Sequence, residues 1–256
     1  MHCLEVSVNQ PDMSADLSVR FLAEGEQSSA TIATLLADFL RGARRSLDIA
    51  IYDFRLSEPL RQIVASAFAD AAAAGVAIRI AYDADKPETP DLVAGMDPAP
   101  LGTGGFVQSL GYPWQRIGGM KLMHNKYIVR DAGEPTAAVW TGSTNFTDDS
   151  WTLQENNIIL IPDAALAASY AQDFADLWAK GVIEDTGAFD TQLTGASYED
   201  GDVSAQVLFS PGRGPAIDYD VGHLVARARR RVRICSMLLN SSALIAARVS
   251  PRLVSV

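Results

Sequence analysis

The segment "SLDIAIYDFRLSEPLRQIVASAFADAAAAGVAIRIAYD", residues 46–83, decides the class of fold. Residues 46–54 alternate apolar with polar positions and are rich in β-forming side chains, which predicts a strand. Ser57 is placed to cap a helix whose apolar residues recur at helical spacing until Gly75, and residues 76–83 predict the next strand. A strand, a helix and a strand of these lengths form a βαβ unit, so we expect parallel strands in a sheet covered by helices.

The residues before this unit also predict a strand and a helix, whereas the residues after it predict a long loop. Residues 19–23 predict a short strand, and Ser28 or Ser29 can cap a helix that stops near Gly42. Residues 84–118 are rich in Pro and Gly and show no period, which predicts a long loop. The stretch "GTGG" in this loop is not expected to open a helix, and it lacks the Gly-Lys-Ser/Thr ending of a nucleotide-binding loop.

A hairpin and one more helix follow the loop. The β-rich runs "KLMHNKYIVRD" at 121–131 and "AAVWTGSTNF" at 137–146 are joined by a turn-forming "AGEP", which predicts a β-hairpin. Residues 156–162 predict another strand, and Asp163 can cap a helix that ends at Gly181. The expected fold class is therefore α/β, with a mixed, mostly parallel β-sheet flanked by helices.

The remaining sequence predicts a linker and an incomplete copy of the first lobe. We expect the first lobe over residues 17–181, an acidic and Gly-rich linker over 182–202, and a partial second lobe over 203–256. Residues 227–239, "RARRRVRICSMLL", match the pattern of residues 42–54, "GARRSLDIAIYDF", which indicates an internal repeat of about 185 residues. Because the sequence ends before a full second copy, the second lobe is expected to lack part of its fold.

Composition restricts the compartment and the partners. The 256 residues are 48% hydrophobic and 20% charged, as in a folded globular protein. The net charge of -10 disfavours broad electrostatic attraction to nucleic acid or to an anionic membrane. No stretch approaches the roughly 18 apolar residues of a membrane-spanning helix, and no signal-peptide pattern is visible, so we expect a cytoplasmic protein without stable membrane insertion. Cys3 and Cys235 are expected to be free thiols.

The strongest candidate site lies in the hairpin. Residues two apart in a strand face the same side, so His124 and Lys126 are expected to project together. Across the hairpin, Ser143 and Asn145 have the same spacing, and Gly142 allows a close approach of the backbone. An imidazole, an ammonium, a hydroxyl and an amide that converge at the mouth of a sheet would bind a tetrahedral anion.

These residues and their spacing resemble a known family. The run "HNKYIVRD", followed by "GSTN" and by "QENNIIL", resembles the H-x-K-(x)4-D signature of the phospholipase D superfamily. The signature is specific for phosphodiester chemistry but not for the substrate. Ten residues separate Asp131 from Gly142. The family commonly has about six, which implies a longer hairpin tip here.

The resemblance implies a role for each residue. His124 would attack phosphorus to give a phosphohistidine. The phosphoryl oxygens would be held by Lys126, Ser143 and Asn145. Glu155 would bind the other imidazole nitrogen and fix its tautomer, and an ordinary exposed carboxylate is the alternative interpretation.

Other acidic residues are assigned structural or solvation roles. Asp131 faces away from the site and is expected to tie its strand to neighbouring backbone. The resemblance implies that neither a metal nor another cofactor is needed, because fixed cations and dipoles neutralise the phosphoryl group. Asp83 and Asp85 follow a strand as metal ligands often do, but solvation of the loop explains them better.

The family's mechanism uses two histidines, one attacking and one protonating the leaving oxygen. This chain has one such motif, because neither His2 nor His223 is followed by a Lys at the required spacing. Two explanations remain open. A homodimer would contribute one His124 from each chain, or the chain is a truncated form of a two-motif protein. The half-repeat favours truncation.

The leading functional hypothesis is a phosphodiester hydrolase or transferase of phospholipase D type, acting on a phospholipid or a related phosphodiester. One alternative is a nuclease with the same chemistry, which the acidic composition makes less attractive. Another is a catalytically incomplete lobe that only binds phosphate. Phe106 and Trp114 could contact an acyl chain or stack on a base, so they do not separate the substrates.

Overall fold

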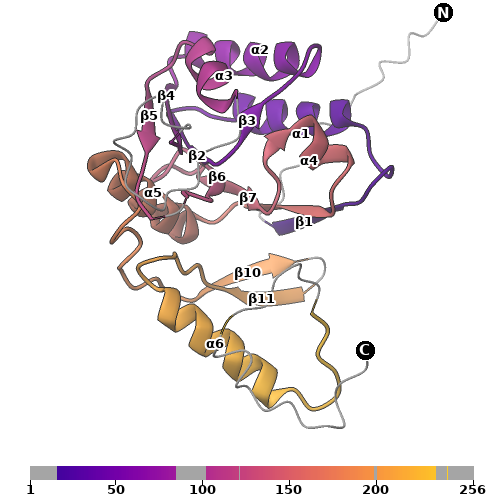
Figure 1. Ribbon diagram of the computed structural model, residues 1–256, viewed down its shortest axis with the longest axis vertical. Coiled ribbons are helices and arrows are strands. Elements are labelled where there is room, and N and C mark those ends of the chain that lie inside the picture. The colour runs from indigo at the N-terminus through magenta and orange to yellow at the C-terminus, as the bar shows by residue number, and fades with distance from the viewer. Residues whose placement is uncertain (1–15, 85–101, 121, 199–200, 235–240, 242–256) are drawn as a thin grey trace, which may run out of the picture.

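The computed structural model describes residues 16–84, 102–120, 122–198, 201–234 and residue 241 (Figure 1). The helices are α1 (Ser29–Arg41), α2 (Leu60–Ala73), α3 (Thr103–Ser109), α4 (Asp148–Thr152), α5 (Ala164–Lys180) and α6 (Gly214–Arg227). The strands are β1 (Asp16–Leu22), β2 (Ser46–Ile51), β3 (Phe54–Arg55), β4 (Ala77–Asp83), β5 (Trp114–Ile117), β6 (Lys126–Arg130), β7 (Ala138–Gly142), β8 (Phe146–Thr147), β9 (Asn156–Ile161), β10 (Thr194–Tyr198) and β11 (Gly201–Ala205). Across these ranges, no helix combines the length and the apolar character needed to span a membrane.

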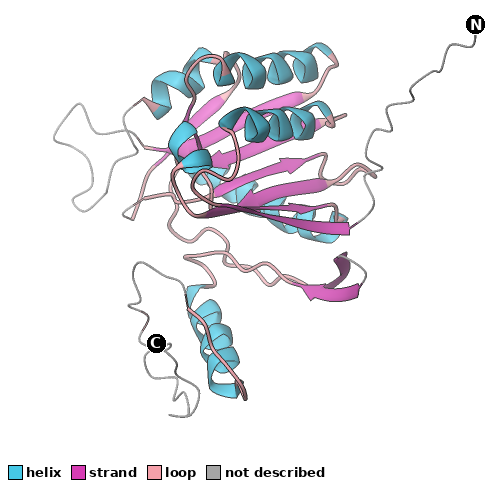
Figure 2. Cartoon of the chain, turned by 90° about the vertical axis from the view of Figure 1, so that its right-hand side faces the viewer, coloured by secondary structure: helices cyan, strands magenta, loops and turns pink. Residues whose placement is uncertain are grey.

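One large sheet organises the first lobe. Its strands run in the order β11-β10-β1-β9-β7-β6-β2-β4-β5, and β3 pairs with β8 in a small second sheet. Helices α1, α2 and α3 pack on one face through a core that includes Leu36, Phe68 and Val107. Helix α5 packs on the opposite face through Phe174 and Leu177 (Figure 2). The predicted α/β class, with a mixed sheet flanked by helices, is confirmed.

The βαβ unit forms as predicted, with a shifted helix start. Strands β2 and β4 pair in parallel over six residues. Helix α2 begins at Leu60 with Pro59 at its N-cap, and not with Ser57. The backbone amide of Ser57 donates to the Asp148 carboxylate at 3.1 Å instead. Proline suits the start of a helix because it has no amide hydrogen to leave unsatisfied.

The prediction that the sheet is mostly parallel was wrong. Five of the eight strand pairs described in the large sheet are antiparallel. The sequence predicted the parallel pair of the βαβ unit and the antiparallel β6–β7 hairpin. It did not predict that β6 also runs antiparallel to β2, or that β7 runs antiparallel to β9. A short connection produces the β6–β7 pair, whereas β2 and β6 are far apart in the sequence and their pairing leaves no local signal.

The prediction of one long loop over residues 84–118 was also wrong for its second half. The "GTGG" stretch opens α3, and β5 adds a parallel edge strand to β4. Long-range packing supports this helix, because Val107 is fully buried and the Phe106 ring lies 4.9 Å from the Phe54 ring. A seven-residue helix is too short to show a period in the sequence. Residues 85–101 lie outside the described residues.

The predicted linker is partly structured. Strand β10 lies inside residues 182–202 and pairs in parallel with β1, while β11 pairs antiparallel with β10. This segment therefore extends the sheet of the first lobe. The residues of β10, "TGASY", carry no run of large apolar side chains that would have predicted a strand.

The internal repeat stays a prediction. Helix α1 begins at Ser29 and α6 at Gly214, so the two helices start 185 residues apart. Helix α6 has no buried residue among those described. The incomplete second lobe stays a prediction, because its next strand was expected mainly in residues outside the described ones.

Asp131 ties the end of β6 to the residues that lead into β2. Its fully buried carboxylate accepts hydrogen bonds from the backbone amides of Arg44, Arg45 and Ser46 at 2.7–3.0 Å, and from the Thr136 hydroxyl at 2.6 Å. Burial alone would raise the pKa of Asp131, but these hydrogen bonds outweigh it and hold the pKa below its usual value. The contacts fit the structural role expected for this residue.

We expect Asp131→Ala to lower the free energy of unfolding at pH 7 by about 2–4 kcal/mol, because several amides lose their acceptor. The native pKa is lowered, so the stabilisation is present above the unfolded pKa of about 4 and is lost as the pH falls through the native value. Denaturant unfolding at pH 7 and pH 3 measures both effects. Thr136→Ala, which removes one hydrogen bond, is the control and should cost about 1 kcal/mol. An Asp131→Ala protein as stable as the wild type would contradict this role.

Candidate active site

The segment before β6 carries His124 and is held at its backbone. The amide of Met123 donates to the Asp83 carboxylate at 2.6 Å, and the Asn125 carbonyl accepts from the Tyr52 amide at 2.9 Å. We expected His124 to lie within a strand. Strand β6 starts only at Lys126, so His124 lies in the segment that leads into the strand. The Lys126 ammonium donates to the His124 carbonyl at 3.1 Å, which keeps the two residues together.

The imidazole of His124 is held in its neutral form. Its ring lies edge-on to the Tyr52 ring, with 4.8 Å between centroids, while part of the side chain is exposed. Loss of hydration, and then the positive charge of Lys126, lower the pKa of His124 to about 4. At pH 7 the ring therefore carries a free lone pair on one nitrogen, as a nucleophile requires.

Lys126 supplies a buried positive charge beside this imidazole. The residue is 8% exposed, and its ammonium lies 5.1 Å from the centroid of the Tyr52 ring. Burial lowers the pKa of Lys126 to about 8, and the carboxylates of Asp53 and Asp83 oppose that shift. The ammonium is therefore mostly charged at pH 7, in a place where water screens it poorly.

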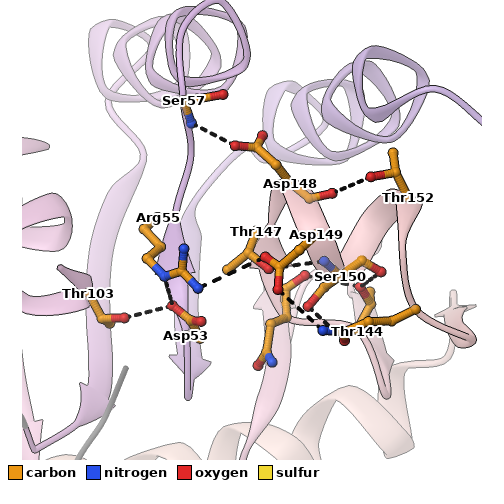
Figure 3. A network of polar contacts seen from close by, with 12 residues as sticks. Asp53, Arg55, Ser57, Thr103, Thr144, Thr147, Asp148, Asp149, Ser150 and Thr152 are labelled. Carbon is orange, nitrogen blue, oxygen red and sulfur yellow. Dashed lines mark hydrogen bonds and ion pairs between the residues drawn. The ribbon is translucent and has the colours of Figure 1, made fainter. Parts of the chain in front are cut away.

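Asp53 belongs to a polar network that the sequence analysis missed. Its buried carboxylate accepts from the Thr103 hydroxyl at 2.8 Å and pairs with Arg55 at 3.2 Å, and Arg55 also approaches Asp149 at 3.9 Å (Figure 3). Burial raises the pKa of Asp53, and Thr103 and Arg55 partly offset this effect. A carboxylate directly after a buried strand, in "IYDF", was the signal that could have identified it.

Gly142 lies where two strands approach closely. Its φ is 135°, and a Cβ there would lie 2.3 Å from the carbonyl oxygen of Asn157 on β9. The backbone therefore requires glycine at this position. Nearby, the Thr141 hydroxyl donates to the Lys126 carbonyl at 3.3 Å, so the end of β7 lies beside the start of β6.

Ser143 and Asn145 follow β7 and lie outside the strands, contrary to the expected strand spacing. The Ser143 hydroxyl donates to Asn156 at 2.9 Å and accepts from the Asn157 amide at 3.0 Å. The side-chain oxygen of Asn145 is buried and has no hydrogen-bond partner in the described part of the chain. The next residue, Phe146, donates its amide to the Asp53 carbonyl at 3.0 Å, which joins this segment to the network around Lys126.

Glu155 is placed differently from the expectation. It is exposed, and within the described ranges it forms no hydrogen bond or ion pair, so the expected contact with His124 is not seen. The alternative interpretation, an ordinary exposed carboxylate, fits this position. Among the residues that the structure describes, no group of three or more His, Cys, Asp or Glu side chains is placed to hold a metal ion.

Comparison with known proteins identifies the family. A family model described as "Cardiolipin synthase, PLD-like domain" matches residues 36–178, more than half of the chain. A mitochondrial cardiolipin hydrolase from Xenopus laevis is 27% identical over 155 residues, covering 59% of this chain and 62% of that protein. The match therefore spans less than two thirds of that relative.

Two solved structures are similar to this chain. A polyphosphate kinase from Porphyromonas gingivalis has a TM-score of 0.51 at 14% identity, covering 84% of this chain and 32% of that one. Nuc, a phospholipase D family member from Salmonella typhimurium, has a TM-score of 0.46 at 22% identity, covering 64% and 96%. Given the match of the family model over the hairpin and its flanking helices, this chain belongs to the phospholipase D-like family.

Proposed function

We propose that this protein is a phosphodiesterase of phospholipase D type in which His124 forms a phosphohistidine intermediate. The observation that carries the proposal is the pairing of a neutral imidazole with a buried ammonium. The first is ready to attack phosphorus, and the second attracts the anionic phosphodiester and stabilises the charge that develops on it.

The reaction would proceed in two displacements. One imidazole nitrogen of His124 forms a bond to phosphorus as the bond between phosphorus and the leaving oxygen breaks, and that oxygen takes a proton from a general acid. Water or an alcohol then attacks phosphorus, loses a proton, and the bond between nitrogen and phosphorus breaks. Lys126, Ser143 and the Asn145 amide would contact the non-bridging oxygens in both steps.

The general acid is proposed to come from a second copy of this motif. Within the described residues, His223 does not fit the role, because its ring contacts Tyr219 of the same exposed helix, with 4.1 Å between ring centroids. A second chain of this protein would bring another His124, and a complete second lobe would bring an equivalent histidine. To act as the general acid, this second histidine would have to carry a proton in the paired site. Both arrangements predict an active site that is shared between two lobes.

The proposed substrate is a phospholipid or a related phosphodiester. The relative whose name is cardiolipin hydrolase supports a lipid phosphodiester. The net charge of -10 disfavours a long polyanion, which makes a nuclease the weaker alternative. A lobe that binds phosphate without turnover is the outcome expected if no second histidine reaches the site.

His124→Asn should abolish hydrolysis of a generic aryl phosphodiester, reducing kcat by about three orders of magnitude or more. Turnover is measured together with the oligomeric state by light scattering. His223→Asn is the matched control and should keep wild-type activity. An active wild type whose activity survives in His124→Asn would end the proposal, and an inactive monomer would favour the phosphate-binding alternative.

Lys126→Ala and Ser143→Ala should each reduce kcat/KM, by about 10²–10³-fold for a group that stabilises the transition state. Ser169→Ala, which changes a half-buried serine on α5, and Lys180→Ala, which changes an exposed lysine at the end of that helix, are the controls. Steady-state kinetics on the aryl phosphodiester measure the effect. If both site variants matched their controls, neither residue would be part of the binding site.

Activity should depend on pH through the ionisation of Lys126 and of His124. Lys126 loses its charge as the pH rises through about 8, so KM for the anionic substrate should increase above that value. The attacking His124 gains a proton only as the pH falls through about 4, so this residue should cause no loss of kcat above that range. Lys126→Arg, which keeps its charge, should move the alkaline limb upward. If the alkaline limb of the pH profile stays near pH 8 in this variant, the limb belongs to a group other than Lys126.

A further inference from the structure

A buried carboxylate on α5 contacts the segment that carries His124 and Lys126 from the face opposite the site. The side-chain amide of Asn125 donates to Asp173 Oδ2 at 3.3 Å, and the hydroxyl of Tyr127 donates to the same oxygen at 2.7 Å. Residues 124 and 126 thus alternate with residues 125 and 127. The first pair is turned toward the site, and the second pair is held by α5.

Asp173 occupies a costly position for a charged group. The residue is 1% exposed, and the described residues place no cation within ion-pair distance of it. Burial raises the pKa of Asp173 to about 6, the Tyr127 hydrogen bond partly offsets this, and Asp176 adds to it. A buried carboxylate without a cation destabilises a fold at neutral pH, so packing alone does not account for it.

The segment it contacts has few other anchors. His124 and Asn125 precede β6, so they lie outside the regular part of the strand ladder. The Asn125 carbonyl accepts from the Tyr52 amide, and the amide of the preceding Met123 donates to the Asp83 carboxylate. The Asp173 hydrogen bonds hold the same segment from the α5 side, which restricts rotation of the lead-in about its own axis.

We propose that Asp173 is a positioning residue that fixes the orientation of His124 and Lys126 by holding the intervening side chains of Asn125 and Tyr127. The inference rests on the proposed phosphodiesterase function. An imidazole nitrogen must meet phosphorus in line with the leaving oxygen, and a displacement of about 1 Å can reduce the rate about 100-fold.

The test compares variants that remove the link from either end. Asn125→Ala removes a half-buried side chain and should leave the fold intact. Asp173→Ala removes the acceptor, while Asp173→Asn keeps one oxygen that can accept both hydrogen bonds. We expect kcat to fall about 10-fold or more in both alanine variants with little change in KM, and Asp173→Asn to recover most of the loss.

A double-mutant cycle separates positioning from general destabilisation. If Asp173 acts through Asn125, the loss of kcat in the double alanine variant should be smaller than the product of the two single losses. Asp176→Asn removes a carboxylate from the same helix and is the control, with kcat unchanged. Independent, multiplicative losses, or melting temperatures that fall in proportion to kcat, would overturn the inference.

A readout that does not need turnover keeps the inference separate from the proposed function. The chain has three histidines, so the imidazole signals in an NMR spectrum can be assigned with His124→Asn and His223→Asn. Asn125→Ala and Asp173→Ala should shift the His124 ring signals and alter its titration, and Asp176→Asn should not. An inactive wild type with these shifts would refute the phosphodiesterase and keep the positioning role. An active wild type in which the His124 ring signals do not shift would refute the positioning role and keep the phosphodiesterase.

Discussion

The carboxylate of Asp131 and the backbone amides before β2 form the contact on which the site depends. This interaction fixes one end of β6, and the opposite end is fixed where the Met123 amide meets Asp83. A strand held at both ends has little freedom to slide, so the side chains at its start keep their register against β2. Because charged acceptors make short, strong hydrogen bonds to backbone amides, acidic side chains are suited to this task.

Burial also produces the electrostatics of the site. The same loss of hydration that keeps His124 neutral also lowers the pKa of Lys126, although that pKa stays at about 8. The carboxylates of Asp53 and Asp83 act against this shift in the pKa of Lys126 and so favour its charged form. An imidazole without charge and an ammonium with charge can then coexist at a separation where two cations would repel each other.

The sequence predicted those parts of the molecule that depend on local patterns. Helix α1, the βαβ unit and the β6–β7 hairpin follow from apolar periodicity and turn residues, and the family was identified from the spacing around His124. Helix α3 and strand β10 depend on long-range packing and pairing, which a local pattern does not contain. Asp173 lies between these two cases. Its position within the apolar stripe of α5 indicates that it is buried, but the local pattern does not indicate which residues it contacts.

The distribution of tryptophan gives the chain an uneven set of spectroscopic reporters. All four tryptophans, at positions 114, 140, 151 and 178, lie in the first lobe, whereas α6 contains no tryptophan and no buried residue. Fluorescence will follow the lobe, while far-ultraviolet circular dichroism will also register the loss of α6. Two melting curves that do not coincide would therefore reflect two cooperative units, and a single free energy of unfolding would not describe the whole chain.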